Sequence, residues 1–206
     1  MLKTNMAVFV SGSGTNLQAL IDAQRSGIIT SGEIKVVISS NPDAYALTRA
    51  ENNGIATAVV SRKGSANQVE FEKGIIEVLD KYEIDLIVLA GFMSILRENF
   101  TGRYADRIIN VHPSLIPSFC GKGFYGLRVH EAALEYGVKV SGATVHFVDE
   151  IPDGGRIILQ KAVEIEEGDT PEILQKRIME NAEWKILPEA AELISKKIME
   201  EKNAAI

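Results

Sequence analysis

The sequence predicts an α/β fold: an open, mostly parallel twisted sheet with helices on both faces and an antiparallel strand near the C-terminal part. Short apolar runs rich in Val and Ile, bounded by Gly, Pro, Asn and Asp, alternate with longer stretches of helical period. This alternation is typical of a parallel sheet covered by its crossover helices. The chain has 206 residues, of which 46% are hydrophobic and 24% charged. We therefore expect one domain over residues 1–206, and a disordered chain is excluded.

The first half of the chain supplies the parallel part of the predicted sheet. Helices are expected where apolar side chains recur at helical spacing. In the third of them the residues that can share one face are Val69, Ile75, Ile76 and Leu79. The expected strands are Met6–Val10, Ile34–Ser39, Ala56–Val60, Asp85–Ala90 and Ile108–Val111, and the expected helices are Asn16–Ser26, Ala44–Asn53 and Asn67–Tyr82.

The pattern changes after His112, where the antiparallel part of the sheet is expected. Thr170 offers a hydroxyl cap, and Pro171 a proline at the first position, to a final helix. The expected elements are a loop from Pro113 to Gly126, a short helix over Val129–Tyr136, an antiparallel pair of strands over Val140–Val148 and Arg156–Val163, and the final helix to about Lys197, interrupted at Pro188.

A net charge of -6 and a single cysteine limit the function class. An acidic surface disfavours nucleic-acid binding, because phosphate backbones are bound by clustered Lys and Arg. Cys120 has no partner for an intrachain disulfide, which is typical of a reducing compartment. The longest apolar stretch, Leu86–Met93, is far shorter than the ~20 residues of a membrane span, and the N-terminal apolar run is too short for a signal peptide. We expect a cytoplasmic protein with no nucleic-acid or membrane partner.

A Gly-rich segment, SGSGTNL, follows the first expected strand and opens the first expected helix. Glycines allow a close approach of the backbone, and the free N–H groups at a helix start bind phosphate. The segment is not a dinucleotide fingerprint, because Leu17 stands where the third glycine would be, and it lacks the Gly-Lys-Ser/Thr ending of a Walker loop. The remaining alternatives are a site for a small monophosphate and an ordinary strand-to-helix turn.

Asn110 and His112 lie at the end of the fifth expected strand. Because they are two residues apart in an extended segment, their side chains project to the same side. An amide donor beside an imidazole could polarise a carbonyl group and move a proton. Asp153, in a DGG turn, could supply a carboxylate that favours the protonated imidazole. The alternatives are a polar strand end with a satisfied histidine and a turn with no other role.

The other histidines and the cysteine are assigned structural roles. His146 lies within an expected strand and is predicted to be a core histidine with one hydrogen bond, while His130 on the short helix is predicted to lie at the surface. Nothing near Cys120 supplies the base that a nucleophile needs. No Cys or His cluster has zinc-ligand spacing, so no metal is expected.

Several segments together resemble the phosphoribosylglycinamide formyltransferase family: SGSGTNLQALI, LAGFMSIL, INVHPSLIPSF, VHFVDEIPDGGRIILQ and GDTPEILQKRI. The likeness runs from about Ala7 to Leu193, with the motifs in the family's order. It implies a Rossmann-related, formyltransferase-like fold. It also implies transfer of a formyl group from 10-formyltetrahydrofolate, as cosubstrate and without a metal, to the amine of glycinamide ribonucleotide in purine biosynthesis.

The resemblance also assigns roles to individual residues. Asn110 and protonated His112 would stabilise the oxyanion, and Asp153 would keep His112 charged. Glu183 would hold the amine of the substrate. The substrate phosphate would lie on Gly14, Thr15 and Asn16, and the folate would contact Met93, Ser94, Ile95, Leu96 and Asn110.

The chain departs from the family pattern at some positions. In EWKILP, Trp184 and Leu187 replace the histidine and tyrosine of the pattern Glu-His-x-Ile-Tyr-Pro. Gln68 stands nearest to the position of a basic residue that reaches the folate in the family, with Arg62 and Lys63 upstream. The loop Cys120–Leu127 belongs to a segment longer than the common form.

Other functions are compatible with parts of the pattern. A formyltetrahydrofolate hydrolase would use water as acceptor, but that family carries an additional N-terminal domain, whereas this chain starts directly at its first expected strand. A methionyl-tRNA formyltransferase would need a basic surface. A non-catalytic phosphate-ligand-binding protein is expected to lose Asn110, His112 and Asp153, which are all present. The expected partners are the two small-molecule substrates, and the expected assembly is a monomer or a homodimer.

Overall fold

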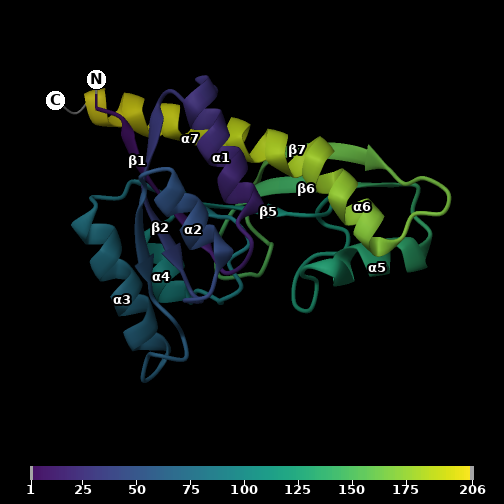
Figure 1. Ribbon diagram of the computed structural model, residues 1–206, viewed down its shortest axis with the longest axis horizontal. Helices are drawn as coiled ribbons and strands as arrows, with labels where there is room; N and C mark the ends of the chain where they lie inside the picture. Colours follow the sequence, from purple (N-terminus) through teal and green to yellow (C-terminus); the bar gives the residue numbers. More distant parts are fainter. Residues whose placement is uncertain (1, 205–206) are drawn as a thin grey trace.

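The structure is a computed structural model that describes residues 2–204, and a single seven-stranded sheet runs through it (Figure 1). The strand order β3-β2-β1-β4-β5-β6-β7 confirms the predicted open sheet. Each strand expected from the sequence is present, with small shifts at its ends. The strands are β1 (Thr4–Val10), β2 (Gly32–Ser39), β3 (Ala56–Val59), β4 (Leu86–Leu89), β5 (Ile108–His112), β6 (Val140–Phe147) and β7 (Ile157–Glu164).

The sheet is parallel from β3 to β5 and antiparallel at β6 and β7, as predicted. β1 lies between β2 and β4, so the strand order reverses at this point. Ligands of open α/β sheets bind in the crevice at such a reversal, outside the carboxyl ends of the strands. The segments that follow β1, β4 and β5 therefore meet at one edge of the sheet.

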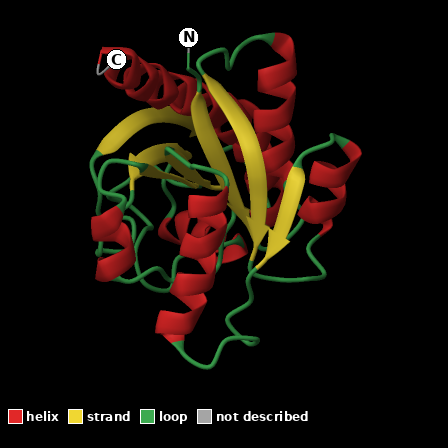
Figure 2. Cartoon of the chain, turned by 90° about the vertical axis from the view of Figure 1, so that its left-hand side faces the viewer, coloured by secondary structure: helices red, strands yellow, loops and turns green. Residues whose placement is uncertain are grey.

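Helices cover both faces of the sheet (Figure 2). On β1, Met6, Val8 and Val10 join one core cluster, whereas Ala7 and Phe9 join the other, as expected of a strand buried on both faces. α1, α2 and α7 contribute to the first cluster, and α3 and α4 to the second. The helices are α1 (Thr15–Ser26), α2 (Tyr45–Asn52), α3 (Gln68–Lys81), α4 (Glu98–Arg103), α5 (Leu127–Tyr136), α6 (Pro171–Ile178) and α7 (Trp184–Ala204), with a π-helical segment, η1 (Met179–Glu183), between α6 and α7.

The C-terminal helix is interrupted at η1 and not at Pro188, so the predicted position of the break was wrong. A proline removes one intrahelical hydrogen bond. Leu187 and Pro188 are nevertheless buried within α7, and the packing of a buried face stabilises a helix more than any single bond within it. α4 was not predicted, because a helix of six residues is too short to show a helical period.

His130 is fully buried, with 0% of its surface exposed, so its predicted surface position was wrong. It lies on α5, which packs against α6 and buries Val129, His130 and Ala133. Neither ring nitrogen of His130 has a hydrogen-bond partner. Burial, together with the charge of His112 whenever that ring is protonated, lowers the pKa of His130 from 6.5 to about 4. The folded state therefore holds this imidazole in its neutral form.

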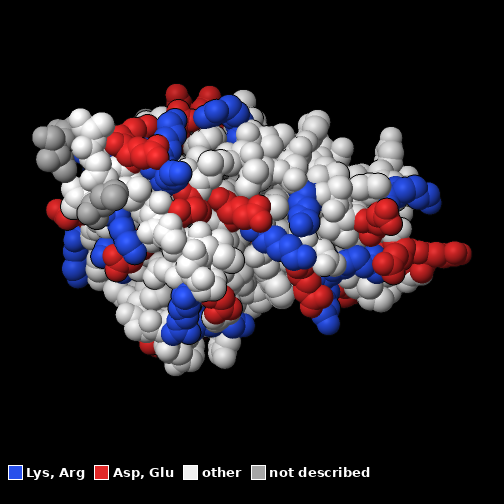
Figure 3. All heavy atoms as spheres, turned by 90° about the horizontal axis from the view of Figure 1, so that it is seen from above, with Lys and Arg blue, Asp and Glu red and all other residues white. Residues whose placement is uncertain are grey.

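The surface carries charges of both signs. On the face seen from above in Figure 3, Lys and Arg side chains are interspersed with Asp and Glu. Among residues 2–204, no helix combines the length and the apolar composition that a bilayer span requires.

The buried His130 predicts a loss of stability in mild acid. The pKa of this group is 6.5 when unfolded and about 4 when folded, so its contribution is complete above pH 6.5 and is lost as the pH falls toward 4. At pH 5 the expected loss in the free energy of unfolding is about 2 kcal/mol. Urea unfolding at pH 5 and pH 7.5 measures it, and His130→Leu should show a smaller difference between the two. An equal difference in this variant would contradict the assignment.

Candidate active site

The Gly-rich segment after β1 forms the tight turn that the sequence predicts. Gly14 has a left-handed backbone with φ 74°, and a Cβ atom there would lie 2.6 Å from the Cβ of Ala46. Glycine is therefore required at this position. α1 begins at the next residue, Thr15, and no side chain caps it. Its first N–H groups lack partners within the helix, which is the arrangement that binds a phosphate group.

Asn16 and Glu183 are far apart in sequence, and the fold brings them together. The Nδ2 of Asn16 donates a hydrogen bond to Oε2 of Glu183 at 2.7 Å. Glu183 is the last residue of η1 and is only 6% exposed. Burial raises the pKa of Glu183, and the hydrogen bond from Asn16 opposes this effect. The Oδ1 of Asn16 is buried without a partner, so an acceptor atom remains free beside the start of α1.

The segment after β4 lies beside the Gly-rich segment. The backbone N–H of Met93 donates to the hydroxyl of Ser11 at 2.9 Å, and this hydroxyl also shares a hydrogen bond with Ser40. Met93 is 58% exposed and Ile95 is 76% exposed, whereas Leu96 packs into the core. The structure therefore joins the segment expected to contact the folate, through Met93, to the start of the Gly-rich segment that leads into α1.

Asn110 and His112 lie on β5, and the pairing with β6 determines their neighbours. The antiparallel register sets Asn110 opposite His146 and His112 opposite Thr144. Residues directly opposite in such a pair project to the same face of the sheet. The Nδ2 of Asn110 lies 3.1 Å from Nε2 of His146.

The hydrogen bonds of His146 determine which of its ring nitrogens carries the proton. Its Nδ1 lies 2.8 Å from the carbonyl oxygen of Phe147, which only accepts, so Nδ1 is the donor. When Nε2 carries no proton, it accepts from Asn110. One N–H of the Asn110 amide is used in this contact, and the second remains free. His146 is buried as predicted, but it has more than the single expected hydrogen bond and belongs to the site.

Asp153 comes from the turn between β6 and β7 and lies between the two histidines. Its carboxylate oxygens are 3.5 Å from Nδ1 of His112 and 3.6 Å from Nε2 of His146. The N–H of Gly121 donates to Oδ2 of Asp153 at 2.8 Å. Asp153 has a left-handed backbone with φ 57°, which aspartate tolerates better than most residues. Gly155 lets this turn approach β6, because a Cβ there would lie 1.8 Å from the carbonyl oxygen of Phe147.

His112 is nearly enclosed, with 4% of its surface exposed. Its Nε2 donates to the carbonyl oxygen of Phe119 at 2.9 Å. Burial lowers the pKa of His112 below 6.5, while the charge of Asp153 and the Phe119 carbonyl act in the opposite direction. The charge of Asp153 thus raises the pKa of His112, as the resemblance implies. In the free protein, however, burial lowers this pKa by more than Asp153 raises it, so the neutral ring is favoured.

The carboxylate of Asp153 remains ionised although it is only 16% exposed. Burial alone would raise its pKa. The contact with His146, the Gly121 amide and, whenever its ring is protonated, the charge of His112 hold the pKa below its usual range. The resting site therefore combines an ionised carboxylate with a neutral imidazole whose Nδ1 faces it.

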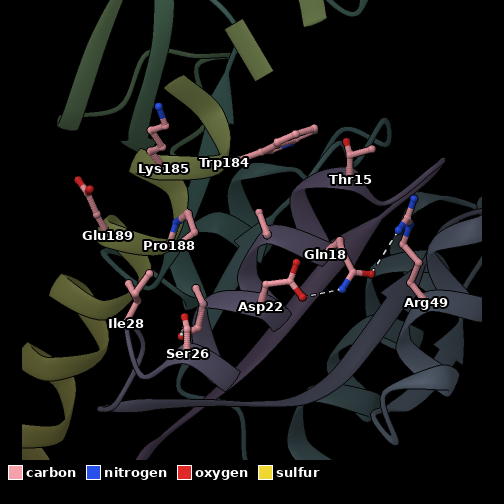
Figure 4. A pocket seen from close by; sticks show the side chains of 12 residues that line it. Thr15, Gln18, Asp22, Ser26, Ile28, Arg49, Trp184, Lys185, Pro188 and Glu189 are labelled. Carbon is pink, nitrogen blue, oxygen red and sulfur yellow. Dashed lines mark hydrogen bonds between the residues drawn. The ribbon is translucent and has the colours of Figure 1, made fainter. Parts of the chain in front are cut away.

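A cavity of about 550 Å³ runs between α1 and α7 (Figure 4). Thr15 and Trp184 both line it, and the ring of Trp184 points toward Thr15. The indole Nε1 of Trp184 is buried without a partner. Asn110 and His112 do not line this cavity, so it adjoins the expected phosphate site and not the expected reaction centre. Leu187, the second departure in EWKILP, is fully buried in the core.

Cys120 shows no sign of activation. Its Sγ donates to the carbonyl of Pro117 at 3.3 Å, and burial and the charge of Asp153 raise the pKa of its thiol. A raised pKa disfavours the reactive thiolate. Within residues 2–204, no group of three or more His, Cys, Asp or Glu side chains could hold a metal ion.

Comparisons with known proteins match most of the chain. A family profile described as Formyl transferase matches residues 4–191. The Trifunctional purine biosynthetic protein adenosine-3 of Homo sapiens is 46% identical over 193 residues, which cover 94% of this chain but only 18% of the length of that relative. The Phosphoribosylglycinamide formyltransferase of Haemophilus influenzae is 45% identical over 183 residues, covering 89% of this chain and 83% of that protein.

Solved structures agree with the sequence matches. The structure of glycinamide ribonucleotide transformylase 1 from Symbiobacterium toebii has a TM-score of 0.88 and 42% identity, and the match covers 95% of this chain and 89% of that chain. The phosphoribosylglycinamide formyltransferase from Brucella melitensis has a TM-score of 0.85 and 39% identity, covering 94% of this chain and 96% of that chain. Both likenesses extend over the sheet and the helices that position the site.

The contact between Asp153 and His112 predicts a measurable pKa change. Asp153→Asn removes the charge that raises the pKa of His112. We expect the pKa to fall further. Titration of the ring nitrogens by NMR, assigned with a His112→Gln variant, measures it. The control Asp106→Asn changes an exposed carboxylate and should leave His112 unaffected. A His112 pKa unchanged in Asp153→Asn would show that the 3.5 Å contact carries no charge interaction.

Proposed function

The chain belongs to the formyl transferase family, and we propose that it transfers a formyl group from 10-formyltetrahydrofolate to the amine of glycinamide ribonucleotide. The products would be formylglycinamide ribonucleotide and tetrahydrofolate. One observation carries the proposal: Asn110, His112 and Asp153 converge at the end of β5, on the same edge of the sheet as the start of α1. A relative that bears this name is 45% identical over 83% of its own length.

The start of α1 supports a site for the substrate phosphate. Gly14, Thr15 and Asn16 present backbone N–H groups at the positive end of the helix dipole. The side chain of Asn16 and the Glu183 carboxylate that it contacts lie beside these N–H groups. Both side chains offer acceptor oxygens to the nitrogen groups of a glycinamide. A substrate with a phosphate at one end and an amine at the other requires this pattern, in which acceptor oxygens lie next to an anion site.

Asn110 supports the activation of the formyl group. Its second N–H is free because the first is held by His146, so it can donate to the formyl oxygen. When the neutral amine forms its bond to the formyl carbon, negative charge develops on that oxygen. A preorganised donor aimed at such an oxyanion contributes ~3–4 kcal/mol to transition-state stabilisation in other acyl transfers.

His112 and Asp153 support the same step electrostatically. Negative charge on the formyl oxygen opposes the effect of burial and raises the pKa of His112, so the ring takes up a proton from solvent at Nδ1, facing Asp153, and releases it when the oxyanion collapses. The charged imidazole then stabilises the oxyanion, and Asp153 balances its charge. The bond from the formyl carbon to the folate nitrogen breaks once the proton lost by the amine has reached that nitrogen. No further reactant is needed.

The segment after β4 supports the site of the cosubstrate. Met93, Ser94, Ile95 and Leu96 follow the strand next to β5, and the exposed Met93 and Ile95 offer apolar contact area. Asn110 lies at the adjoining strand end. The single cysteine is typical of a reducing compartment, and the proposal includes a protein of one domain that acts in the cytoplasm, as a monomer or a homodimer.

The test is an absorbance assay of the purified protein with 10-formyltetrahydrofolate, with and without glycinamide ribonucleotide. Deformylation that requires the ribonucleotide and is abolished in His112→Ala supports the proposal. Formyl loss at the same rate without the ribonucleotide would indicate a hydrolase. Ligand binding without any reaction would indicate a non-catalytic phosphate-ligand-binding protein.

Two substitutions separate the roles of the site residues. Asn110→Ala removes the oxyanion donor, and we expect kcat to fall about 100- to 1,000-fold. Asp153→Asn keeps the shape of the side chain but not its charge, and we expect turnover to fall severely while ligand binding is largely retained. Steady-state kinetics and calorimetric titration measure the two effects, with Asp106→Asn as the matched surface control. Wild-type turnover in Asp153→Asn would remove this carboxylate from the mechanism.

A further inference from the structure

The segment Met93–Arg97, between β4 and α4, has few packing contacts of its own. Met93 and Ile95 are 58% and 76% exposed, and Leu96 is the member of the segment that reaches the core. Side-chain packing therefore leaves most of this backbone unconstrained. Its position depends on the polar contacts that it makes with neighbouring elements.

Gln68 and Glu72, one turn apart on α3, provide such contacts. The Nε2 of Gln68 donates to the carbonyl oxygen of Ile95 at 2.9 Å and to Oε1 of Glu72 at 2.7 Å. The same Oε1 accepts from the backbone N–H of Arg97 at 2.8 Å. Glu72 is 7% exposed, so the carboxylate that joins the two contacts is shielded from water, whereas the hydrogen bond from Gln68 to Ile95 is exposed. α3 thus binds one carbonyl and one N–H group of the segment.

The chemistry of an amide side chain suits this role. Its nitrogen carries two N–H groups and no charge, so it can bind a carbonyl oxygen and a carboxylate at once. Both N–H groups of Gln68 are used in this way. Neither is left to bind a carboxylate of a bound ligand.

We propose that Gln68 is a positioning residue for the formyl-folate cosubstrate. Together with Glu72, it holds the Met93–Arg97 segment in the conformation that binds the cosubstrate, and it does not contact the cosubstrate itself. This inference rests on the proposed function, in which the segment binds the folate. This role differs from that of a residue that would bind the glutamate tail of the folate directly.

The first experiment compares kinetic constants. Gln68→Ala removes both donors, and we expect the KM for 10-formyltetrahydrofolate to rise about tenfold. The kcat and the KM for the ribonucleotide should change less than about twofold, because the reaction centre is untouched. Gln68→Glu keeps the size of the side chain but places a second carboxylate beside Glu72, so its effect should be at least as large. Lys73→Ala, at an exposed position of the same helix, is the control and should behave as wild type.

A truncated cosubstrate distinguishes positioning from direct contact. 10-Formyltetrahydropteroate lacks the glutamate tail. If Gln68 acts through the segment, Gln68→Ala raises the KM for the truncated and the complete cosubstrate by the same factor. If the factor disappears with the truncated compound, Gln68 contacts the tail and the inference is overturned.

Hydrogen exchange tests the anchoring independently of activity. The N–H of Arg97 is bound to Glu72, so its exchange should be faster in Gln68→Ala and unchanged in Lys73→Ala. Unchanged exchange would overturn the anchoring role, whatever the assay shows. Faster exchange with an unaltered KM would show that the segment does not set the affinity for the cosubstrate. If the wild-type protein does not transfer the formyl group, the proposed function is refuted. The exchange experiment does not depend on activity and would still test whether Gln68 anchors the segment.

Discussion

The antiparallel hydrogen bonds between β5 and β6 set Asn110 opposite His146 and His112 opposite Thr144. A slip of one residue in this pairing would turn each of these side chains to the other face of the sheet. Thr144 also accepts from the N–H of Ile116 and donates to the carbonyl of Ser114, so the same register holds the start of the loop that follows β5. The orientation of the Asn110 amide, the enclosure of His112 and the course of this loop all depend on this one pairing.

The loop after β5 and the turn before β7 then complete the electrostatics of the site. Phe119 provides the carbonyl that binds Nε2 of His112, and Gly121 provides the N–H that binds Asp153. Burial raises the pKa of Asp153 and lowers the pKa of His112. The contacts outweigh the effect of burial at Asp153 but not at His112. The pKa of Asp153 stays low and the pKa of His112 is also lowered, so the resting pair carries one negative charge. A site of this kind is prepared to accept positive charge on the imidazole at the moment when negative charge develops nearby.

The candidate site was predictable from the sequence where local chemistry is unusual. The SGSGTNL segment, the pair Asn110 and His112 at a strand end, and the turn of Asp153 stand out by residue type and spacing. His146 did not, because a histidine within an apolar strand has the same appearance whether it has one partner or several. Only the strand register shows that it holds Asn110. Gln68 and Glu72 were likewise recognisable as one turn of a helix, but their partners lie in another segment.

The sequence by itself determined the succession of the strands and of the longer helices along the chain, the parallel and antiparallel parts of the sheet, and the turn at Gly14, because periodicity and turn chemistry act within a few residues. The tertiary structure decided the burial of His130, the contact of Asn16 with Glu183, and the break of the last helix at η1. Periodicity shows which side chains share a face of an element. It does not show what packs against that face, and burial, pKa shifts and hydrogen-bond partners depend on the packing.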